Sequence, residues 1–430
     1  MTLLQLVVYD RMFSATFDTI AAYLYQDYPK DAKPIYIEFP SNIATACNLD
    51  PAQLYRMNKY LYGIPTAGKA YYLSYSSHLS NNGFTKSIID PCLFYRVQGT
   101  TRTLCWFHVD DTFVASTSME EIHSFHSMLQ NKFRFTMNLD ASQYLGIELH
   151  KGPDGSVQLL QTKLMKDIID EYGNDAKVRM YPATISNRHQ SNHSEIDIDK
   201  TKCSGLLGKL QYLNHSRPDI RTAVSYNASI NRPTINDYEK LLDLVRYLLI
   251  TKDKGLILYP SENSIDEPVV PTCYVDASYL SHMDGKSHSG YIIGFGDIPK
   301  SYFYSKSAKQ KLVATSSTHA EIRALYELTL KLIYITSIFQ EIGREVRTPI
   351  IIHEDNQPVI DLTNPDKIIN GTIKSKHFVM ICEFIKEKCR EGLLALLKCP
   401  TEKNESNVMT KIVVGNEFHQ SLTDILGTPI

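Results

Sequence analysis

The residues in the first half of the chain that are best suited to chemistry are two neighbouring aspartates, Asp110 and Asp111. They lie between the apolar run 104–109 and the segment 112–115, a pattern that predicts a strand, a tight turn and a second strand. Nucleotidyl transfer needs carboxylates that converge on two Mg²⁺ ions, and a hairpin tip can present one beside a neighbouring strand. Aspartate is also a favoured turn residue, so this pair alone leaves catalysis and a simple turn both open.

A partner carboxylate is present upstream at Asp18. It ends the alternating stretch 12–17 and precedes the apolar segment 20–25, so we expect it at the end of a strand that opens a helix. An acid in that place can be a metal ligand, and it can equally be a helix N-cap.

The segment that follows the paired aspartates is predicted to be a helix. Ser118 is its expected N-cap, and Glu121 has the spacing of a capping box. Its apolar side chains recur at helical spacing, at Ile122, Phe125, Leu129 and Phe133.

Three acids in the C-terminal part lie near the ends of predicted elements: Asp276, Glu321 and Asp355. Together they could form a second two-metal site at one end of a sheet. Each also has a simpler interpretation. Glu321 could close a capping box with Thr318, and the two aspartates could be turn residues.

The elements that must position these acids alternate between strand and helix. We expect a helix over 318–342 that stops at Gly343, a buried strand over 349–353, and an earlier helix over 235–251. The other candidate strands are 272–276, 290–295, 301–305 and 311–315. This order predicts an α/β sandwich of mixed sheet and helices.

A chain of 430 residues exceeds one ordinary core, so two or three domains are expected. Polar segments at 183–202 and 259–271 are the predicted joints. No apolar run approaches the roughly 20 residues of a membrane helix, and the N-terminus does not resemble a signal peptide. The scattered cysteines include no C-x-x-C pair, which favours buried free thiols over a zinc ribbon.

The formal net charge of −2 argues weakly against nucleic acid as a partner. Basic residues do gather at 300–311 and 374–377, where a binding patch and an ordinary solvated surface are both open. The pairs His123/His126 and His189/His193 have metal-site spacing, but without further ligands surface histidines are the better interpretation. Walker A and G-x-S-x-G motifs are absent from the sequence.

The order of short segments is more informative than any one of them. It resembles the order of motifs in copia-type retrotransposon reverse transcriptases, in which 107–111 (FHVDD) is similar to Y-V-D-D. The other similar segments are 18–25 (DTIAAYLY), 60–71 (YLYGIPTAGKAY), 90–94 (DPCLF), 144–148 (YLGIE) and 217–220 (RPDI). The run continues into segments that resemble the RNase H of the same family, at 276–278, 289–291, 316–321, 355–357 and 376–377.

The resemblance implies an α+β or α/β multidomain protein. Residues 1–182 would form a right-hand polymerase palm with partial fingers, 183–265 a mostly helical thumb or connection, and 268–430 an RNase H-like domain. Its partners would be an RNA template, a DNA primer, dNTPs and RNA–DNA hybrid, with no membrane. The resemblance also implies an intracellular location, in cytoplasmic virus-like particles and the nucleus.

The resemblance also implies roles for the acids. Asp18, Asp110 and Asp111 would bind two Mg²⁺ ions for polymerisation, with Mn²⁺ as an alternative. A second set would hold two Mg²⁺ ions that activate a water against the RNA strand of a hybrid, namely Asp276, Glu321 and Asp355.

Three further residues would contact polymerase substrates. Tyr23 would be the aromatic gate that leaves no room for a 2′ hydroxyl under the incoming sugar. Lys69 would lie near the template or incoming nucleotide, and His108 near the primer.

The chain departs from the family pattern in four places. The fingers segment should precede Asp18, and its loss would weaken dNTP binding and expose apolar surface near Leu3, Leu4 and Leu6. His108 replaces a tyrosine. Thr66 replaces a glutamine expected at the dNTP or template. In 406–411 (SNVMTK) Asn407 replaces the fourth RNase H carboxylate, and an amide binds Mg²⁺ more weakly.

Three hypotheses therefore stand. The intact acids favour a reverse transcriptase with RNase H. The departures favour a relic that keeps the fold and catalyses nothing. A nucleic-acid-binding protein that uses the groove without the chemistry is the third, and it would bind hybrid duplex in a salt-dependent way.

Overall fold

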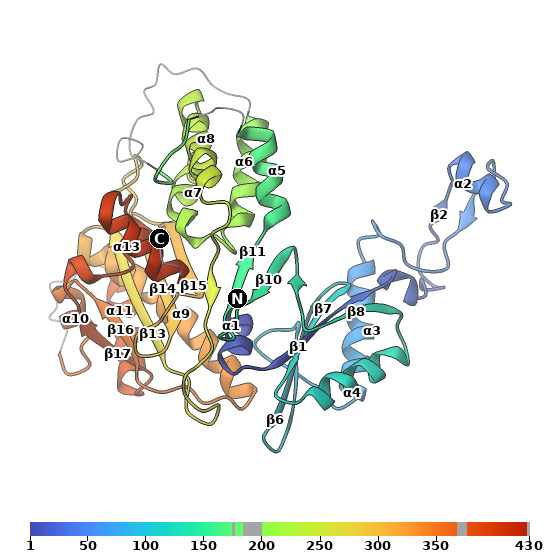
Figure 1. The fold of residues 1–430 in the computed structure, drawn as a ribbon, viewed down its shortest axis with the longest axis horizontal. Coiled ribbons are helices and arrows are strands. Elements are labelled where there is room, and N and C mark those ends of the chain that lie inside the picture. The colour runs from blue at the N-terminus through green and yellow to red at the C-terminus, as the bar shows by residue number, and fades with distance from the viewer. Residues whose placement is uncertain (174–176, 184–199, 368–375, 428–430) are drawn as a thin grey trace. The chain divides into compact units, whose positions relative to one another are not determined.

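The computed structural model describes residues 1–173, 177–183, 200–367 and 376–427. The chain forms two compact units (Figure 1). The smaller unit consists of Met12–Tyr144, and the larger unit combines Met1–Arg11 with Leu145–Ile430. Both units mix helices with sheet, so the predicted α/β multidomain architecture is confirmed.

The smaller unit is built on one six-stranded sheet with the order β4-β5-β6-β7-β1-β8. β1 lies between β7 and β8 and is antiparallel to both. The predicted hairpin is confirmed, since β6 and β7 pair antiparallel across a two-residue turn. The strands are β1 (Phe13–Thr19), β4 (Thr85–Lys86), β5 (Leu93–Gln98), β6 (Thr101–His108), β7 (Asp111–Ser116) and β8 (Phe135–Leu139).

Two helices, α3 (Ala67–Asn81) and α4 (Met119–Gln130), pack on one face of this sheet. Side chains alternate along a strand, so Phe17 of β1 and Thr112 of β7 both point toward the helices. The Phe17 ring lies 5.4 Å from that of Phe125 in α4, and Tyr75 of α3 hydrogen-bonds Thr112 at 2.9 Å. The same alternation turns every second side chain of these strands toward the opposite face.

The capping box predicted for α4 is wrong, although Ser118 is its N-cap. The Glu121 carboxylate accepts from the guanidinium of Arg96 and so does not return to the backbone. Both side chains are largely buried, and the Arg96 guanidinium gives the carboxylate an oppositely charged partner, which a backbone N–H does not.

Apart from β9 (Gln143–Tyr144) at its C-terminal end, the remaining elements of the smaller unit come from the segment between β1 and α3. It contains only short elements: η1 (Ala22–Tyr25), β2 (Tyr36–Ile37), α2 (Ser41–Ala46) and β3 (Tyr55–Arg56). β2 and β3 pair as a small antiparallel ribbon.

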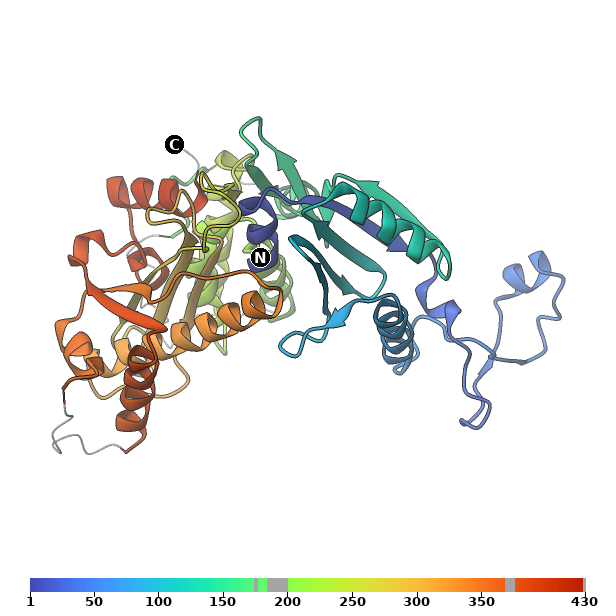
Figure 2. The same ribbon diagram turned by 90° about the horizontal axis from the view of Figure 1, so that it is seen from below.

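The larger unit is organised around a five-stranded sheet with the order β15-β14-β13-β16-β17. β13, β14 and β15 are antiparallel neighbours, whereas β16 and β17 run parallel to β13. α9 and α11 lie on one side of this sheet and α13 on the other (Figure 2). The strands are β13 (Pro271–Ser278), β14 (His288–Phe295), β15 (Tyr304–Lys309), β16 (Ile350–Glu354) and β17 (Leu394–Lys398), and the helices are α9 (Ser317–Glu341), α10 (Gln357–Thr363), α11 (Lys376–Arg390), η4 (Thr401–Lys403), α12 (Asn407–Thr410) and α13 (Gly415–Leu426).

Most elements predicted for this sheet are confirmed, including the long helix and its stop at Gly343, where φ is +67°. The strand predicted at 301–305 begins later, at Tyr304. The strand predicted at 311–315 is wrong. Leu312 and Val313 there are more than half exposed and lie in the connection to α9, so their β-propensity finds no sheet edge to pair with.

Helices α5, α6, α7 and α8 form the middle of the chain, and the helix predicted at 235–251 is confirmed as α8. Its N-terminus is closed by a capping box between Thr234 and Asp237. The elements are β10 (Ile147–Lys151), β11 (Val157–Leu160), α5 (Thr162–Tyr172), α6 (Lys200–Leu213), η3 (Pro218–Ile220), α7 (Arg221–Ala228), α8 (Ile235–Ile250) and β12 (Ile257–Leu258).

The segment 217–220 (RPDI) is a buried structural joint in this region. The fully buried Arg217 makes a two-bond contact with Asp219, at 2.9 and 2.7 Å. The same guanidinium donates to the carbonyl of Thr251, and the Tyr247 hydroxyl donates to Asp219. Because every charge is hydrogen-bonded, this network ties the start of α7 to the end of α8 without leaving a buried group unpaired.

Helix α1 (Thr2–Tyr9) corrects another expectation, that of exposed apolar surface near the N-terminus. Leu4 and Leu6 are buried, and Leu3 is half-buried. α1 belongs to the larger unit, where the Asp10 carboxylate that follows it pairs with Arg344 at 3.0 Å. The apolar side of α1 is therefore covered by packing within this unit.

Five of the eight cysteines are buried, and none of the eight forms a disulfide, as predicted. Within the described part of the chain, no helix is long and apolar enough to cross a membrane.

Candidate active sites

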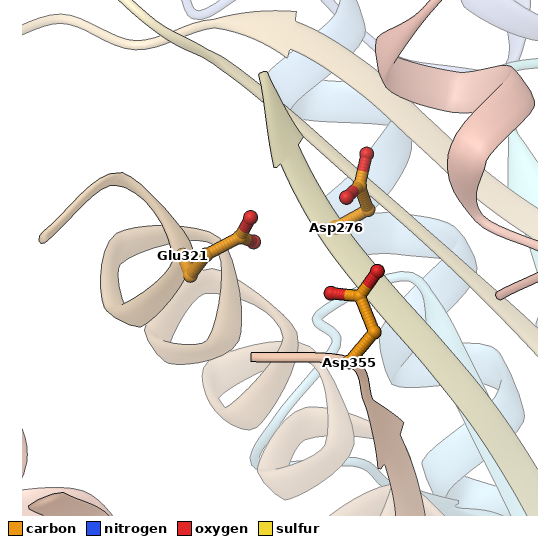
Figure 3. Close-up of side chains that lie close together, drawn as sticks. All are labelled: Asp276, Glu321 and Asp355. Atoms are coloured by element: carbon orange, nitrogen blue, oxygen red, sulfur yellow. The ribbon is translucent and has the colours of Figure 1, made fainter. Parts of the chain in front are cut away.

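Three carboxylates of the larger unit converge, as Figure 3 shows, so that one oxygen of each lies within 4.8 Å of the other two. Asp276 is in β13, Asp355 directly follows β16, and Glu321 is in the N-terminal part of α9. Because β13 and β16 are parallel neighbours, residues late in both strands reach the same edge of the sheet. The predicted grouping of these acids is what the fold produces.

The simpler interpretations fail for Glu321 and Asp276. The N-cap of α9 is Ser316, whose hydroxyl accepts from the backbone N–H of His319 at 3.1 Å, so Glu321 takes no part in a capping box. Asp276 is paired within β13 opposite Gly290, and it is not a turn residue.

The environment of the cluster disfavours negative charge. Burial, with neighbouring acids as a further cause, raises the pKa of Glu321 well above its ordinary range, and burial also raises that of Asp276. Among the described residues, Oε2 of Glu321 has no hydrogen-bond partner although it is buried. A carboxylate that faces two others and keeps a buried oxygen unpaired fits a hard divalent cation, which prefers oxygen ligands.

The segment from α12 to Lys411 closes one side of Asp276. The Thr410 hydroxyl donates to Oδ2 of Asp276, and Nζ of Lys411 lies 3.3 Å from Oδ1. Gly290 makes this approach possible, since a Cβ there would lie 2.5 Å from the Thr410 side chain and 2.7 Å from Met409. The sequence pattern singles out only Asn407 in this segment, and no spacing rule indicates the contacts of Thr410 and Lys411.

Glu354 is a further acid of this region that the sequence pattern did not indicate. It is fully buried at the end of β16, and burial raises its pKa to about 8. One of its oxygens accepts from the backbone N–H of Asn356 at 2.9 Å. Its place in an apolar run concealed it, because the buried strand was predicted to end one residue earlier.

The acids of the smaller unit are brought together by strand pairing. Asp18 of β1 lies directly opposite Asp111 of β7, and the backbone N–H of Thr19 donates to the carbonyl of Asp110 at 3.0 Å. Asp18 and Asp111 point to the face that α3 and α4 do not cover, since their neighbours in each strand point to the helices. Asp18 is therefore a strand residue and not an N-cap.

The three acids of the smaller unit are nevertheless less converged than those of the larger unit. Among the described residues, their oxygens do not form a set within 4.8 Å. Burial, followed by the charges of Asp110 and Asp18, raises the pKa of Asp111. Asp110 instead accepts a 3.3 Å hydrogen bond from Tyr62, a contact that the sequence analysis did not anticipate.

The turn that carries Asp110 has an unusual backbone. Val109 adopts a positive φ of 56°, a conformation that β-branched residues rarely occupy. Such conformations persist only where the surrounding structure enforces them, and they concentrate at functional sites.

The residues predicted to contact polymerase substrates lie on the same unit. The half-buried Tyr23 follows β1 in η1, and its ring centroid is 4.4 Å from that of Tyr62. Lys69 is exposed in the first turn of α3, just after the N-cap Thr66, and His108 ends β6 opposite Asp111.

Several other residues that the sequence patterns singled out make local contacts. Three lysines of 300–311 each lie within 3 Å of a carboxylate oxygen: Lys300 with Glu262, Lys306 with Glu327 and Lys309 with Asp284. Asp90 of the segment 90–94 accepts from the backbone N–H of Cys92. His123 is exposed on α4, and the His189/His193 pair and Lys374 lie outside the described residues.

Comparison with known proteins agrees with the order of these motifs. Residues 2–184 match the family model described as reverse transcriptase (RNA-dependent DNA polymerase). The retrovirus-related Pol polyprotein from transposon RE2 of Arabidopsis thaliana is 28% identical over 365 residues, which are 84% of this chain. That from transposon TNT 1-94 of Nicotiana tabacum is 25% identical over 420 residues, or 93% of this chain and 30% of the relative.

The chain is a region of a copia/Ty1-type retrotransposon Pol polyprotein. The predicted family is thereby confirmed, and residues 2–184 are its reverse-transcriptase region. This Pol region spans only 24% of the length of the RE2 relative. The solved structure of a foamy viral protease–reverse transcriptase in complex with RNA/DNA hybrid aligns over 90% of the Pol region and 44% of its own chain, with a TM-score of 0.46 and 9% identity.

Proposed function

We propose that residues 268–430 of this Pol region cleave the RNA strand of RNA–DNA hybrids with the help of divalent cations, Mg²⁺ or Mn²⁺. The observation that carries the proposal is the convergence of Asp276, Glu321 and Asp355, of which Glu321 also keeps a buried oxygen unpaired. The similar order of motifs in copia-type Pol proteins supports the same assignment.

Asp276, Glu321 and Asp355 would hold the cation. Bound there, a divalent cation would supply positive charge to the scissile phosphate and lower the pKa of a water. The Thr410 hydroxyl fixes the orientation of the Asp276 carboxylate, so that Oδ1 remains on the side of Lys411. Burial keeps bulk water from Asp276 and Glu321, which strengthens their attraction for the cation.

The test is cleavage of a labelled RNA–DNA hybrid in Mg²⁺ or Mn²⁺. Asp276→Asn and Asp355→Asn should each reduce the rate by at least about two orders of magnitude, as expected for ligands of a catalytic cation. A matched control is Asp297→Asn, an exposed acid of the same unit. Rates that the cluster variants leave unchanged would refute the proposal.

We further propose that the reverse-transcriptase region is an RNA-directed DNA polymerase. The cross-strand pair Asp18/Asp111, with Asp110 in the strained turn beside it, is the specific observation that favours this. In this assignment residues 1–182 are the palm with partial fingers and 183–265 the thumb or connection. Tyr23 would be the sugar gate, and Lys69 and His108 would contact nucleic acid.

Primer extension on an RNA template with dNTPs tests this second proposal. The chain should extend the primer, and Asp110→Asn/Asp111→Asn should abolish extension. Failure of the folded parent chain to extend would favour the relic, and salt-dependent binding of hybrid without turnover would favour the nucleic-acid-binding protein.

The remaining expectations follow from the same proposals. RNA template, DNA primer, dNTPs and RNA–DNA hybrid would be the partners, in cytoplasmic virus-like particles or the nucleus. Variants of Asp110 and Asp111 should leave hybrid cleavage intact, because the two sets of acids lie in different units.

A further inference from the structure

Lys411 is held beside the acid cluster by two contacts. Its Nζ lies 2.6 Å from Oδ1 of Asn407 and 3.3 Å from Oδ1 of Asp276. Its backbone N–H also donates to the carbonyl of Asn407 at 2.8 Å, which fixes the start of the side chain. The ammonium thus lies at the edge of the cluster, and it contacts the Asp276 carboxylate that also belongs to the cluster.

The orientation of Asn407 is determined by a third bond. Its Nδ2 donates to the carbonyl of Thr401 at 2.7 Å, so its oxygen must face Lys411. The only oxygen that this side chain could offer a cation is therefore already engaged by the ammonium. A neutral amide also adds no negative charge to offset a further cation.

Charge balance then limits what the cluster can hold. The three carboxylates carry three negative charges when ionised, and one divalent cation together with one ammonium supplies three positive charges. A second divalent cation would leave a surplus of two positive charges within a few ångströms, in a largely buried place where repulsion is poorly screened.

We propose that Lys411 takes the place of a second divalent cation, so that the cluster Asp276–Glu321–Asp355 binds one divalent cation and no second one. The inference rests on the proposed cation-dependent cleavage by residues 268–430. Lys411 is in this view a positioning residue that supplies a fixed positive charge through Asp276 and Asn407.

The experiment counts Mn²⁺ bound per chain by calorimetry and by electron paramagnetic resonance. The parent is the full chain with Asp18→Asn, Asp110→Asn and Asp111→Asn, which removes the acids of the smaller unit. Only the Mn²⁺ that is lost on a further Asp276→Asn change is counted, so that adventitious surface binding is excluded.

The parent and its Lys411→Arg variant should each bind one Mn²⁺ at the cluster. Asn407→Asp alone should also bind one, because the ammonium remains between the two carboxylates. Asn407→Asp with Lys411→Gln should bind two, since a carboxylate is gained and the ammonium is lost. Lys388→Gln is the matched control for lost charge, since Lys388 in α11 pairs with Glu391 just after that helix, and it should leave the count at one.

Other outcomes overturn the inference. Two Mn²⁺ of similar affinity in the parent or in Asn407→Asp would show that the ammonium does not exclude a second cation. A single Mn²⁺ in the folded double variant would show that something else limits binding. Should the double variant not fold, Lys411→Gln alone must bind a second Mn²⁺ at least about tenfold more tightly than the parent.

Failure of the proposed function gives a different result. If Asp276→Asn removes no bound Mn²⁺ from the parent, the cluster is not a cation site. Both the proposed cleavage mechanism and the role of Lys411 are then refuted together. If the parent binds more than one Mn²⁺ at the cluster and Asp276→Asn abolishes that binding, only the role of Lys411 is refuted.

Discussion

At the scale of single residues, the cost of a carboxyl group to stability depends on its surroundings. Asp18 lies at an exposed strand position, whereas Asp276 and Glu321 are buried among other acids. A buried carboxyl group that stays protonated in the folded state opposes folding wherever the unfolded chain would ionise it. The larger unit therefore bears a cost in stability for its cluster until a cation is bound.

Glu321→Gln tests this cost. The pKa of Glu321 is raised in the folded state. Below the ordinary glutamate pKa of 4.5 the group is protonated in both the folded and the unfolded chain and costs no stability. As the pH rises above 4.5, the unfolded chain ionises first, and the free energy of unfolding falls. In EDTA the variant should therefore melt higher than the parent at pH 8, by about 2–4 °C for each kcal/mol relieved, with little difference near pH 4.

Thermal melts in EDTA at several pH values measure the effect, and added Mn²⁺ should stabilise only the parent. Glu341→Gln, at the far end of α9, is the control. Equal melting temperatures at pH 8 would contradict the prediction.

At the scale of elements, a strained turn and a close contact between two elements position the acids of the two sites. The β6–β7 turn holds Val109 at a positive φ, and Gly290 of β14 lets α12 approach Asp276. In both places the local sequence is adapted to position an acid, one by strain and the other by the absence of a side chain.

Val109→Gly should stabilise the smaller unit. Strain at such a φ costs on the order of 1–3 kcal/mol, and glycine removes it while losing about 0.5–1 kcal/mol of backbone entropy. We expect a net gain of about 1 kcal/mol in the free energy of unfolding, measured by the fluorescence of Trp106 in the same hairpin. The control Val97→Gly, in β5 without positive φ, should destabilise.

Gly290→Ala should act in the opposite direction on the larger unit. The added Cβ would lie 2.9 Å from the backbone of Met409, so α12 must move away from β14. We expect a loss of about 1–3 kcal/mol in stability and weaker Mn²⁺ binding at Asp276, measured by unfolding and calorimetry. Gly208→Ala in α6, which meets no atom within 4 Å, should instead be neutral or stabilising.

At the scale of the whole molecule, the two compact units do not follow the order of the chain. Residues 1–11 belong to the larger unit, and the buried pair Asp10–Arg344 joins positions 334 residues apart. The single tryptophan, Trp106, lies in the smaller unit, so its fluorescence reports on that unit separately.

Asp10→Ala should therefore destabilise the larger unit by about 3–5 kcal/mol, because it leaves Arg344 buried without its ionic partner. Hydrogen exchange in β13 and α9 should quicken, while the Trp106 transition stays unchanged. Asp297→Ala, which breaks the exposed pair with Arg347, should cost less than about 1 kcal/mol. Slow exchange in β13 of the Asp10 variant would contradict the prediction.

The sequence by itself determined the features that depend on local pattern. Alternation and turn residues predicted the hairpin of Asp110 and Asp111, helical spacing predicted α4, α8 and α9, and the order of motifs identified the family. The predictions of the hairpin and the helices succeed because the conformation of each segment depends mainly on its own residues and their spacing.

Only the tertiary structure decided which side chains meet across long separations. Glu121 bonds Arg96 instead of its own helix, 311–315 finds no sheet edge, and Lys411 reaches Asp276 from 135 positions away. Such contacts depend on which surfaces the packed elements bring together. A charged side chain bonds the strongest partner that packing brings within reach, and local spacing does not contain that information.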